Sequence, residues 1–545
     1  MQLFKKKHTM KQNILIKISK TLSVVALLIF TTACTDLEIS STGTSTLEPA
    51  FDGLDQGESA SQVDGMYNNI RGYIGDQANT FALSEVTTDA LLIPTRGSDW
   101  GDNGIWRQLH QHSWTPDHAF ITTAWNQWNQ LQLGASEILD SRSTPDTATE
   151  FQAHFLRALG MYMILDNFGQ VPFRNTEIDP VIDPEVFTGI EAVDFIEADL
   201  TTAISGLPSA SPGGDNVRGT AEAAKYLLAK LLLNKHVYTN SSPDASDMTR
   251  VVTLVDEIAS QGFGAQAGYF DIFRESSDIE TIWYVNTGVG NRIFNGLHYN
   301  STTAGGGGWN GFSTLAEYYD LFEGDMNNNR YDAAGNAIDG QEERRGGVPP
   351  SGDAAGTEGS NVGFGFLIGQ QFDVDGTPLQ DRAGAPLAFT RDFTNAATGA
   401  LSLTDNNEIS GIRMMKYNPR YGGFTEHEIF FRYADAHLMK AEAIMRGGSS
   451  ADTPLGLVNQ LRSLRNANGN TPPLTSLSEQ DLLDERGREL YMEFWRRNDL
   501  IRFGQYTRDW AFKESSAIGN TEKHVFPIPA SQVILNPNLV QNPGY

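Results

Sequence analysis

Residues 147–172, TATEFQAHFLRALGMYMILDNFGQVP, show the helical period that dominates this chain. Large apolar residues recur there every fourth position, which places them on one face of a helix. Thr147 and Glu150 have the spacing of a capping box, and Gly169 and Pro172 are typical of a helix end. We therefore expect a helix that begins at Thr147 and ends at Gly169. The apolar face consists of Phe151, Phe155, Leu159 and Met163.

Similar periodicity extends on both sides of this segment. Helical periodicity covers most of residues 57–260, and a second helix is expected to begin at Thr220. Two further helices are expected at residues 431–446 and 482–502. Helix pairs of similar length are compatible with tetratricopeptide-like stacking. The leucines that we expect the Thr220 helix to bury are Leu227, Leu228, Leu231 and Leu232.

The middle of the chain is different. Residues 301–424 contain 22 of the 53 glycines, and Asn-Gly, Asp-Gly and Gly-Gly pairs recur. We expect loops and short strands there, inserted into the helical scaffold. The predicted organisation is one domain over residues 50–545, with a helical part at 50–282, a loop-rich insertion at about 283–425 and a helical part at 426–545.

The N-terminus has the layout of a cleaved secretory signal. Residues 1–33 carry six lysines and no acid, and an apolar run precedes Cys34. This predicts a signal peptide at residues 1–33, lipidation of Cys34 and a flexible tether at residues 34–49. Thr31 stands where lipoprotein signals usually have Leu, so an ordinary signal peptide beside an unrelated cysteine is the alternative.

Composition excludes several classes of protein. Cys34 is the only cysteine, so a disulfide or a Cys-ligated metal is excluded. Removal of the six lysines would change the net charge from −27 to about −33, which repels nucleic acid. Short motifs for nucleophilic hydrolases, zinc proteases and phosphate-binding loops are absent, so we expect no enzyme.

Two turn-rich segments combine aromatic and hydrogen-bonding side chains. They are residues 95–103, TRGSDWGDN, and residues 307–311, GGWNG. Sugars present C–H faces that stack on aromatic rings and hydroxyl groups that need polar partners. We expect Trp106, Trp114, Trp125 and Trp128 to belong to the core. The predicted ligand-binding residues are Arg96, Asp99, Trp100, Asn103, Trp283, Asn291, Trp309 and Asn310.

No metal or cofactor is predicted. The sequence Asp325-x-Asn327-x-Asn329 begins like a calcium loop but lacks its glycine and its bidentate glutamate, which leaves an irregular structural calcium site as an alternative. His110 and His112 have no third ligand at metal spacing. The charged residues from Glu485 to Arg497 are expected to form a structural salt-bridge ladder along one helix.

Motifs spread along the chain resemble those of the SusD/RagB family of outer-membrane nutrient-binding lipoproteins of Bacteroidetes. The matching segments, in chain order, are Ser84–Asp89, Pro94–Trp100, Trp106–Trp114, Ala153–Pro172, Ala223–Lys230, Phe431–Ala443, Glu485–Leu490, Asp499–Arg502, Phe526–Pro529 and Gln541–Tyr545.

The resemblance implies a mainly α-helical fold, in which tetratricopeptide-like helix pairs support a loop-rich binding face with short strands. It also implies a lipid-anchored protein on the outer membrane, facing the cell exterior, that delivers oligosaccharide or polysaccharide to a SusC-type TonB-dependent transporter. In starch-binding members, aromatic residues from the N-terminal loop and the middle of the chain contact the sugar; Trp100 with Asn103 and the stretch 283–310 are similar in placement. We expect a neutral glycan, with β-glucan as the first candidate.

The sequence is also compatible with two other functions. Some family members bind peptides, so a peptide-binding lipoprotein of the same fold is the second hypothesis. A divergent glycan hydrolase is the third.

Overall fold

The computed structural model describes residues 51–273, 278–301, 307–332, 334–349, 362–373, 376–417 and 427–545. Within it, Gly53–Tyr545 form one compact unit. The predicted signal peptide 1–33, the lipidation site Cys34 and the tether 34–49 lie outside the described residues.

The longer helices form two groups along the chain. The first group is α2 (Gln56–Gly75), α5 (Ala119–Ile138), α6 (Thr147–Phe168), α7 (Gly189–Gly206), α8 (Ala221–Tyr238) and α9 (Ala245–Ser260). The second group is α12 (Tyr433–Met445), α13 (Pro454–Leu464) and α14 (Glu479–Leu490), followed by the short α15 (Arg496–Arg502). The shorter helices are α3 (Asn79–Phe81), α4 (Ile105–Gln111), α10 (Gly290–Gly296), α11 (Ala316–Tyr319) and α16 (Ala530–Leu535).

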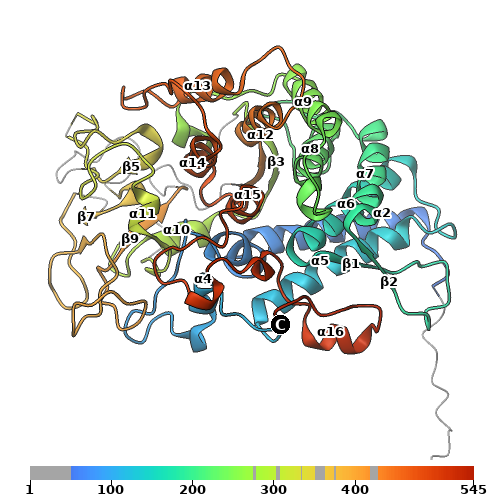
Figure 1. Cartoon of the computed structure of the whole chain (residues 1–545), viewed down its shortest axis with the longest axis horizontal. Helices are drawn as coiled ribbons and strands as arrows, with labels where there is room; N and C mark the ends of the chain where they lie inside the picture. Colours follow the sequence, from blue (N-terminus) through green and yellow to red (C-terminus); the bar gives the residue numbers. More distant parts are fainter. Residues whose placement is uncertain are drawn as a thin grey trace, which may run out of the picture. The chain divides into compact units, whose positions relative to one another are not determined.

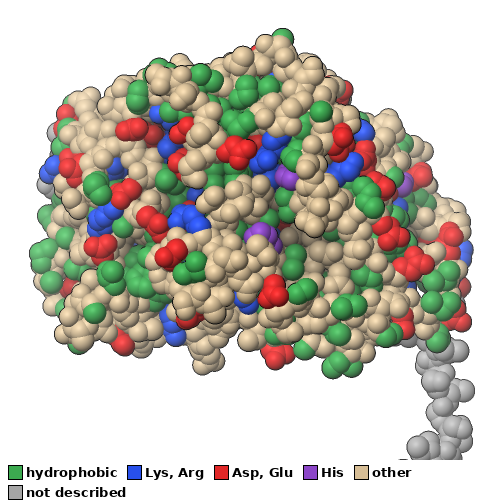
Figure 2. Space-filling view, in the orientation of Figure 1, with side chains coloured by type: hydrophobic (Ala, Val, Ile, Leu, Met, Phe, Trp, Pro, Cys, Tyr) green, Lys and Arg blue, Asp and Glu red, His purple; other side chains and the backbone are tan. Residues whose placement is uncertain are grey.

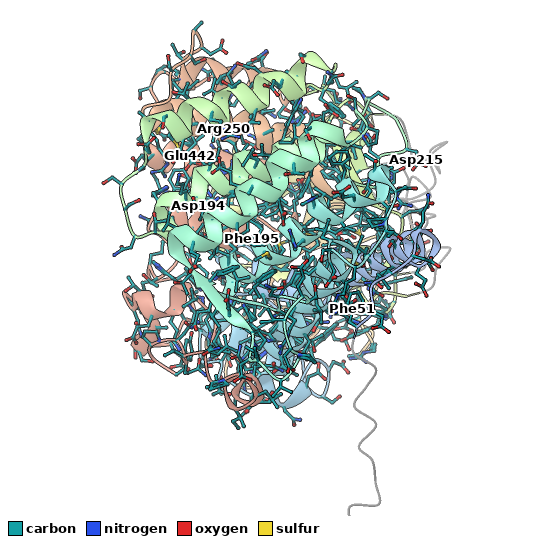
Figure 3. The ribbon with its side chains drawn as sticks, turned by 90° about the vertical axis from the view of Figure 1, so that its right-hand side faces the viewer. Phe51, Asp194, Phe195, Asp215, Arg250 and Glu442 are labelled. Carbon is teal, nitrogen blue, oxygen red and sulfur yellow. The ribbon has the colours of Figure 1, made fainter. Side chains whose placement is uncertain are left out.

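Successive helices pack against one another. Contacts run from α5 to α6, α7, α8 and α9 in turn, and α9 contacts α12, which packs on α13 and α14 (Figure 1). Seen from the side, α7 and α9 lie on the outer face, with Asp194 and Phe195 on α7 and Arg250 on α9 (Figure 3). Arg250 forms an ion pair with Glu197 of α7 at 2.6 Å. The predicted mainly helical fold with a strand-bearing, loop-rich region is confirmed.

Two helices follow the sequence expectation closely. The α6 helix covers Thr147–Phe168 and ends at Gly169, but its N-cap is Asp146, whose carboxylate accepts the Thr149 N–H, so the predicted capping role of Thr147 is wrong by one residue. The α8 helix begins after Thr220, and its four predicted leucines are buried. Gly160 of α6 lets the helix approach α5 closely, because a Cβ there would lie 2.9 Å from the Trp128 carbonyl oxygen.

The single helix predicted at residues 482–502 is wrong. The segment forms α14 and α15, separated by a turn in which Met492 and Phe494 have positive φ angles. Its charged side chains are buried and pair mainly with other elements, so the predicted ladder along one helix is replaced by a three-dimensional ion network.

Short antiparallel strand pairs complete the fold. The strand pairs are β1 (Gln170–Phe173) with β2 (Glu185–Thr188), β3 (Thr281–Val285) with β10 (Glu428–Arg432), and β7 (Gly369–Gln370) with β8 (Ala388–Phe389). A four-stranded sheet has the order β4 (Ser313–Thr314), β9 (Ile412–Met415), β6 (Phe364–Leu367) and β5 (Gly346–Gly347). Because β3 pairs with β10, the glycine-rich segment leaves and re-enters the helical scaffold at one place.

The main hydrophobic core runs through both the helical part and the glycine-rich part, and residues of α12, α13 and α14 form a smaller separate cluster. Trp106, Trp114, Trp125 and Trp128 are buried in the main core, as predicted. Among the described residues, no helix is long and apolar enough to cross a membrane.

Candidate functional site

Trp100 and Trp309 lie side by side although they are far apart in the sequence. The Trp100 indole N–H donates a hydrogen bond to the Trp309 carbonyl oxygen at 2.7 Å. The Trp309 ring packs against Phe294, with ring centres 5.3 Å apart, and the Trp100 ring packs edge-on against the buried Trp106 at 5.8 Å. Both rings are half-buried, so each keeps part of its surface in contact with solvent.

We refer to Asp99, Trp100, Asn103, Phe294, Trp309 and Arg382 as the tryptophan site. Unusual backbone conformations accumulate around it. Trp100 has φ +58°, Asn103 has φ +53° and Asn310 has φ +55°, all in the left-handed region that non-glycine residues rarely adopt. Strained residues of this kind persist where the surrounding structure holds them, and they gather at binding sites.

Glycine residues allow the loop that carries Trp309 to lie close to the loop that carries Trp100. A Cβ on Gly308 would lie 2.1 Å from the Leu297 carbonyl oxygen, and one on Gly311 would lie 2.8 Å from the Trp100 ring. The glycines around Trp309 therefore allow the loop to lie directly on neighbouring backbone and on Trp100, rather than serving only to expose the ring.

Charged side chains connect the loops at the rim of the site. Arg382, whose side chain is 48% exposed, forms ion pairs with Asp99 at 2.6 Å and with Glu408. Its guanidinium carbon lies 4.1 Å from the centre of the Tyr299 ring. The hydrogen bond to Glu408 raises the pKa of Arg382 above its ordinary value despite some burial. Arg382 thus remains charged and ties the Asp99 loop to the Glu408 loop. Asn103, three residues after Trp100, is exposed.

Three residues that were predicted to contact the ligand are buried, so the prediction is corrected for each of them. Trp283 is fully buried in the core, where its indole N–H donates to the Val217 carbonyl oxygen at 3.1 Å. Its ring packs edge-on against Phe155 and Phe431. A large apolar ring on a strand that joins two parts of the core is shielded on all sides, so Trp283 cannot touch a ligand here.

Arg96 and Asn310 lie under the tryptophan site. The Arg96 guanidinium donates to the carbonyl oxygens of Asn310, Asn407 and Ser410 and to the Ser313 hydroxyl. Arg413 donates to the Asn310 side-chain oxygen at 2.6 Å. Burial lowers the pKa of Arg96 to about 9. Both predicted residues therefore support the loops and do not reach the surface.

Asn291 also has a structural partner. Its side-chain N–H donates to the Gly75 carbonyl oxygen at 2.9 Å, which ties α10 to the end of α2. The residue is half-buried, and this hydrogen bond uses one of the two side-chain N–H groups.

Phe294, Tyr299 and Arg382 were missed by the sequence reasoning. The two aromatic residues fall within the stretch 283–310 that was singled out, so an aromatic count there could have found them. Arg382 had no such signal, because one arginine in a glycine-rich loop is not distinguished by its neighbours.

The residues considered for metal binding have other partners. His110 Nε2 bonds the Ala511 carbonyl oxygen and His112 Nε2 bonds the Thr87 carbonyl oxygen. Asp325 accepts the Asn327 N–H in a turn, and Asn329 is buried and donates to the Phe366 carbonyl oxygen. Within the described ranges, no group of three or more His, Cys, Asp or Glu side chains could hold a metal ion.

The arrangement is suited to binding a hydroxylated ligand. Two partly exposed indole rings offer apolar faces, and a carboxylate, a guanidinium and an amide next to them offer acceptors and donors. The charges of Asp99 and Arg382 balance one another.

Comparisons with known proteins place this chain among similar proteins. The family model described as the SusD family matches residues 279–545. The starch-binding protein SusD of Bacteroides thetaiotaomicron is 26% identical over 91% of this chain and 88% of its own. A solved laminarin-binding SusD-like protein is 19% identical, with a TM-score of 0.61, covering 90% of this chain and 100% of its own. Surface glycan-binding protein A of B. thetaiotaomicron, solved in complex with laminarihexaose, is 17% identical, with a TM-score of 0.60, covering 90% of this chain and 99% of its own.

Proposed function

This chain belongs to the SusD/RagB family, and we propose that it is a non-catalytic glycan-binding protein that holds a neutral polysaccharide on its tryptophan site. The observation that carries the proposal is the juxtaposition of Trp100 and Trp309, which the indole-to-carbonyl hydrogen bond holds in place. The rings would stack on sugar faces. Asp99, Asn103 and Arg382 would bond hydroxyl groups.

The proposed ligand is a β-glucan such as laminarin. The net charge of −27 disfavours polyanionic glycans, and the rim pairs its own charges. Two structural neighbours bind laminarin or laminarihexaose by their descriptions, which supports testing that glycan first. A shallow stacking site gives dissociation constants from micromolar to millimolar, or about −8 to −4 kcal/mol.

Affinity electrophoresis tests the proposal. The protein from residue 35 is run on gels that contain laminarin, starch, xylan, mannan, alginate or pectin, beside Trp309→Ala and Trp125→Ala variants. Trp309→Ala removes a half-buried ring at the site, so we expect at least a tenfold loss of affinity for the bound glycan. Trp125→Ala removes a core ring, so we expect lower stability but unchanged retardation at a temperature where the variant is folded.

The result also separates the alternatives. Equal retardation of wild type and Trp309→Ala would refute the tryptophan site. If none of the six glycans retards the wild type while oligopeptides bind, the peptide-binding function replaces this one. Shortened glycan products after incubation would show a hydrolase and contradict the non-catalytic assignment.

We further propose that lipid on Cys34 anchors the protein to the outer membrane, facing the cell exterior, and that it passes glycan to a SusC-type TonB-dependent transporter. Mass spectrometry of the protein purified from its own membranes tests the anchor: an acylated Cys34 is expected as the first residue. An unmodified N-terminus would support the ordinary signal peptide.

An exposed apolar patch supports a protein partner. It includes Val181 and Ile182 on the loop between β1 and β2 and Ile534 and Leu535 on α16, which are between 53% and 83% exposed. Asn536 and Asn538 donate to the Pro184 carbonyl oxygen and hold the two segments together. Large exposed apolar side chains in one area are typical of interaction surfaces. The double change Ile534→Asp and Leu535→Asp should abolish co-purification of a TonB-dependent barrel and leave glycan retardation unchanged.

A further inference from the structure

A hollow of about 630 Å³ lies outside the tryptophan site. Its walls are formed by Glu317 on α11, by Leu401 and by the segments Arg391–Phe393 and Asp509–Lys513. We call it the Phe512 hollow and define it by Glu317, Arg391, Phe393, Leu401, Asp509 and Phe512. Its volume is within the range of sites that hold small ligands. None of the predicted ligand-binding residues belongs to it.

Apolar side chains form one part of this hollow. The Phe393 and Phe512 rings meet edge to face, with centres 6.1 Å apart and planes at 81°. Leu401 is 66% exposed at the rim. Phe393 is buried and supports the Phe512 ring, so the apolar surface open to a ligand consists of Leu401 and the half-buried Phe512 ring.

The backbone at Phe512 is unusual. Its φ angle is +70°, which is rare for a bulky residue, and its ring is half-buried. The Ala511 N–H before it donates to the Glu317 carboxylate at 3.2 Å, and the Lys513 ammonium after it donates to the Tyr506 carbonyl oxygen at 2.6 Å. Hydrogen bonds on both sides therefore hold this ring in a strained position, as at Trp100.

The polar side chains of the hollow are suited to an uncharged ligand. Arg391 forms a bidentate ion pair with Asp320 and also donates to the Met326 carbonyl oxygen at 2.8 Å. Arg508 pairs with Glu317 at 3.3 Å. Asp509 adds an exposed carboxylate. Acidic and basic groups alternate with hydrophobic ones on the face that carries α11 and α4 (Figure 2). Such a rim accepts and donates hydrogen bonds to hydroxyl groups and gives little attraction to an anion.

One segment joins the hollow to the tryptophan site. Phe393 packs directly on Gly411, where a Cβ would lie 2.1 Å from the ring. The Ser410 carbonyl oxygen accepts from Arg96 at 2.6 Å and from Arg413 at 2.8 Å, the two arginines beneath the tryptophan site. The Phe512 hollow and the tryptophan site therefore rest on one packed segment.

We propose that the Phe512 hollow is a second subsite for the same neutral polysaccharide, holding one or two sugar units of a chain that also contacts the tryptophan site. This inference rests on the proposed glycan-binding function. Two subsites on one rigid support raise the affinity for a polymer above that of either alone, because the second contact is intramolecular.

The test uses the protein from residue 35 in affinity gels with the same six polysaccharides. Phe512→Gly removes the ring and suits the positive φ angle, so it should preserve the fold. Leu401→Ala is matched by Leu535→Ala, a leucine of α16 that is 70% exposed. We expect about a tenfold loss of affinity for the bound polysaccharide in Phe512→Gly, a smaller loss in Leu401→Ala and no change in Leu535→Ala.

The outcomes distinguish the two proposals. Weak retardation that persists in Trp309→Ala and disappears in the double variant with Phe512→Gly would support the second subsite. Wild-type affinity in Phe512→Gly, together with loss in Trp309→Ala, would overturn the second subsite and leave the proposed function intact. Absence of retardation of the wild type by all six polysaccharides would overturn both. Thermal melting of each variant checks that it is folded.

Discussion

Two groups of buried arginines show how the helical and the glycine-rich parts of this molecule are stabilised. In the helical part, Arg432 and Arg465 pair with Glu280 and Glu489 at 2.8 Å. At the glycine-rich part, Arg413 and Arg96, which comes from the N-terminal loop 95–103, donate to carbonyl, amide and hydroxyl oxygens of the loops. We call them the carboxylate-held and the carbonyl-held arginines.

The difference follows from backbone hydrogen bonding. The carbonyl groups of a helix accept hydrogen bonds from N–H groups of the same helix. An arginine buried among helices therefore needs carboxylates to balance its charge. Loop carbonyl groups have no such partners, and one guanidinium with five N–H donors can satisfy several of them.

The pKa values show the same difference. Although burial lowers the pKa of an arginine, Glu493, Glu489 and Glu280 outweigh this effect and hold the pKa of Arg432 well above its ordinary value. Burial and the charge of Arg96 lower the pKa of Arg413 well below its ordinary value. The first group stabilises the scaffold, and the second positions the loops of the tryptophan site.

The largest effect is expected from Glu489→Gln. Glu489 accepts from Arg465, Arg432 and Arg344, and loss of its charge leaves buried arginines partly uncompensated. We expect the free energy of unfolding to fall by about 3–5 kcal/mol in urea denaturation. Glu197→Gln, which removes the surface pair with Arg250, is the control, with a change of about 0–1 kcal/mol. Equal effects in the two variants would contradict the structural role of the network.

Acid should act on the same ion network through Glu485, whose partner Arg344 also pairs with Glu489. Burial raises the pKa of Glu485, but Arg344, Arg488 and Arg462 outweigh it and hold this pKa at about 2, below the ordinary value of 4.5. The unfolded chain therefore binds the proton more readily, so the stabilisation is present above about pH 4.5 and is lost as the pH falls toward 2. We expect about 3 kcal/mol from this residue. Urea titrations at pH 6, 4 and 3 should show a smaller pH dependence in Glu485→Gln than in the wild type; an identical pH dependence would refute the assignment.

Arg413→Met tests the carbonyl-held group. The change removes the donor to the Asn310 side-chain oxygen and to the Gly411 carbonyl oxygen, and one of two donors to the Glu408 and Ser410 carbonyl oxygens, so we expect a loss of about 2–3 kcal/mol in stability. Because Asn310 follows Trp309, glycan affinity should also fall at temperatures where the variant is folded. Unchanged affinity in the folded variant would show that the tryptophan site does not depend on this arginine.

The smallest change in stability is expected from Arg382→Gln. Its ion pairs are partly exposed, so the free energy of unfolding should change by about 0–1 kcal/mol. Glycan affinity should nevertheless fall several-fold, because the Asp99 loop loses its connection to Glu408. Arg330→Gln, which breaks the exposed pair with Asp339, should leave affinity unchanged and serves as the control.

The helical scaffold was predictable where local pattern and packing agree. The limits of α6 and the burial of the α8 leucines follow from the helical spacing of apolar residues, from the N-cap residues and from the glycine that ends α6. The break between α14 and α15 was missed, because Met492 and Phe494 take positive φ angles that their sequence does not suggest. At this break, burial of the charged side chains outweighs the local helix propensity of the sequence.

The candidate site was predictable only in part. Trp100 and Trp309, which the structure places side by side, were singled out because aromatic residues in glycine-rich turns are recognisable. Trp283 was misjudged, because burial depends on neighbours such as Phe155 and Phe431 that come from distant segments.

The sequence by itself determined the family, the helical scaffold and the two segments that carry the tryptophans, because period, composition and ordered motifs are local properties of the chain. Only the tertiary structure decided that Arg96, Asn310 and Trp283 lie beneath the surface and that Arg382 joins the rim. It also revealed the Phe512 hollow. Burial and ion pairing depend on contacts between residues hundreds of positions apart, such as Arg96 with Asn310 and Asp99 with Arg382, and no local pattern contains that information.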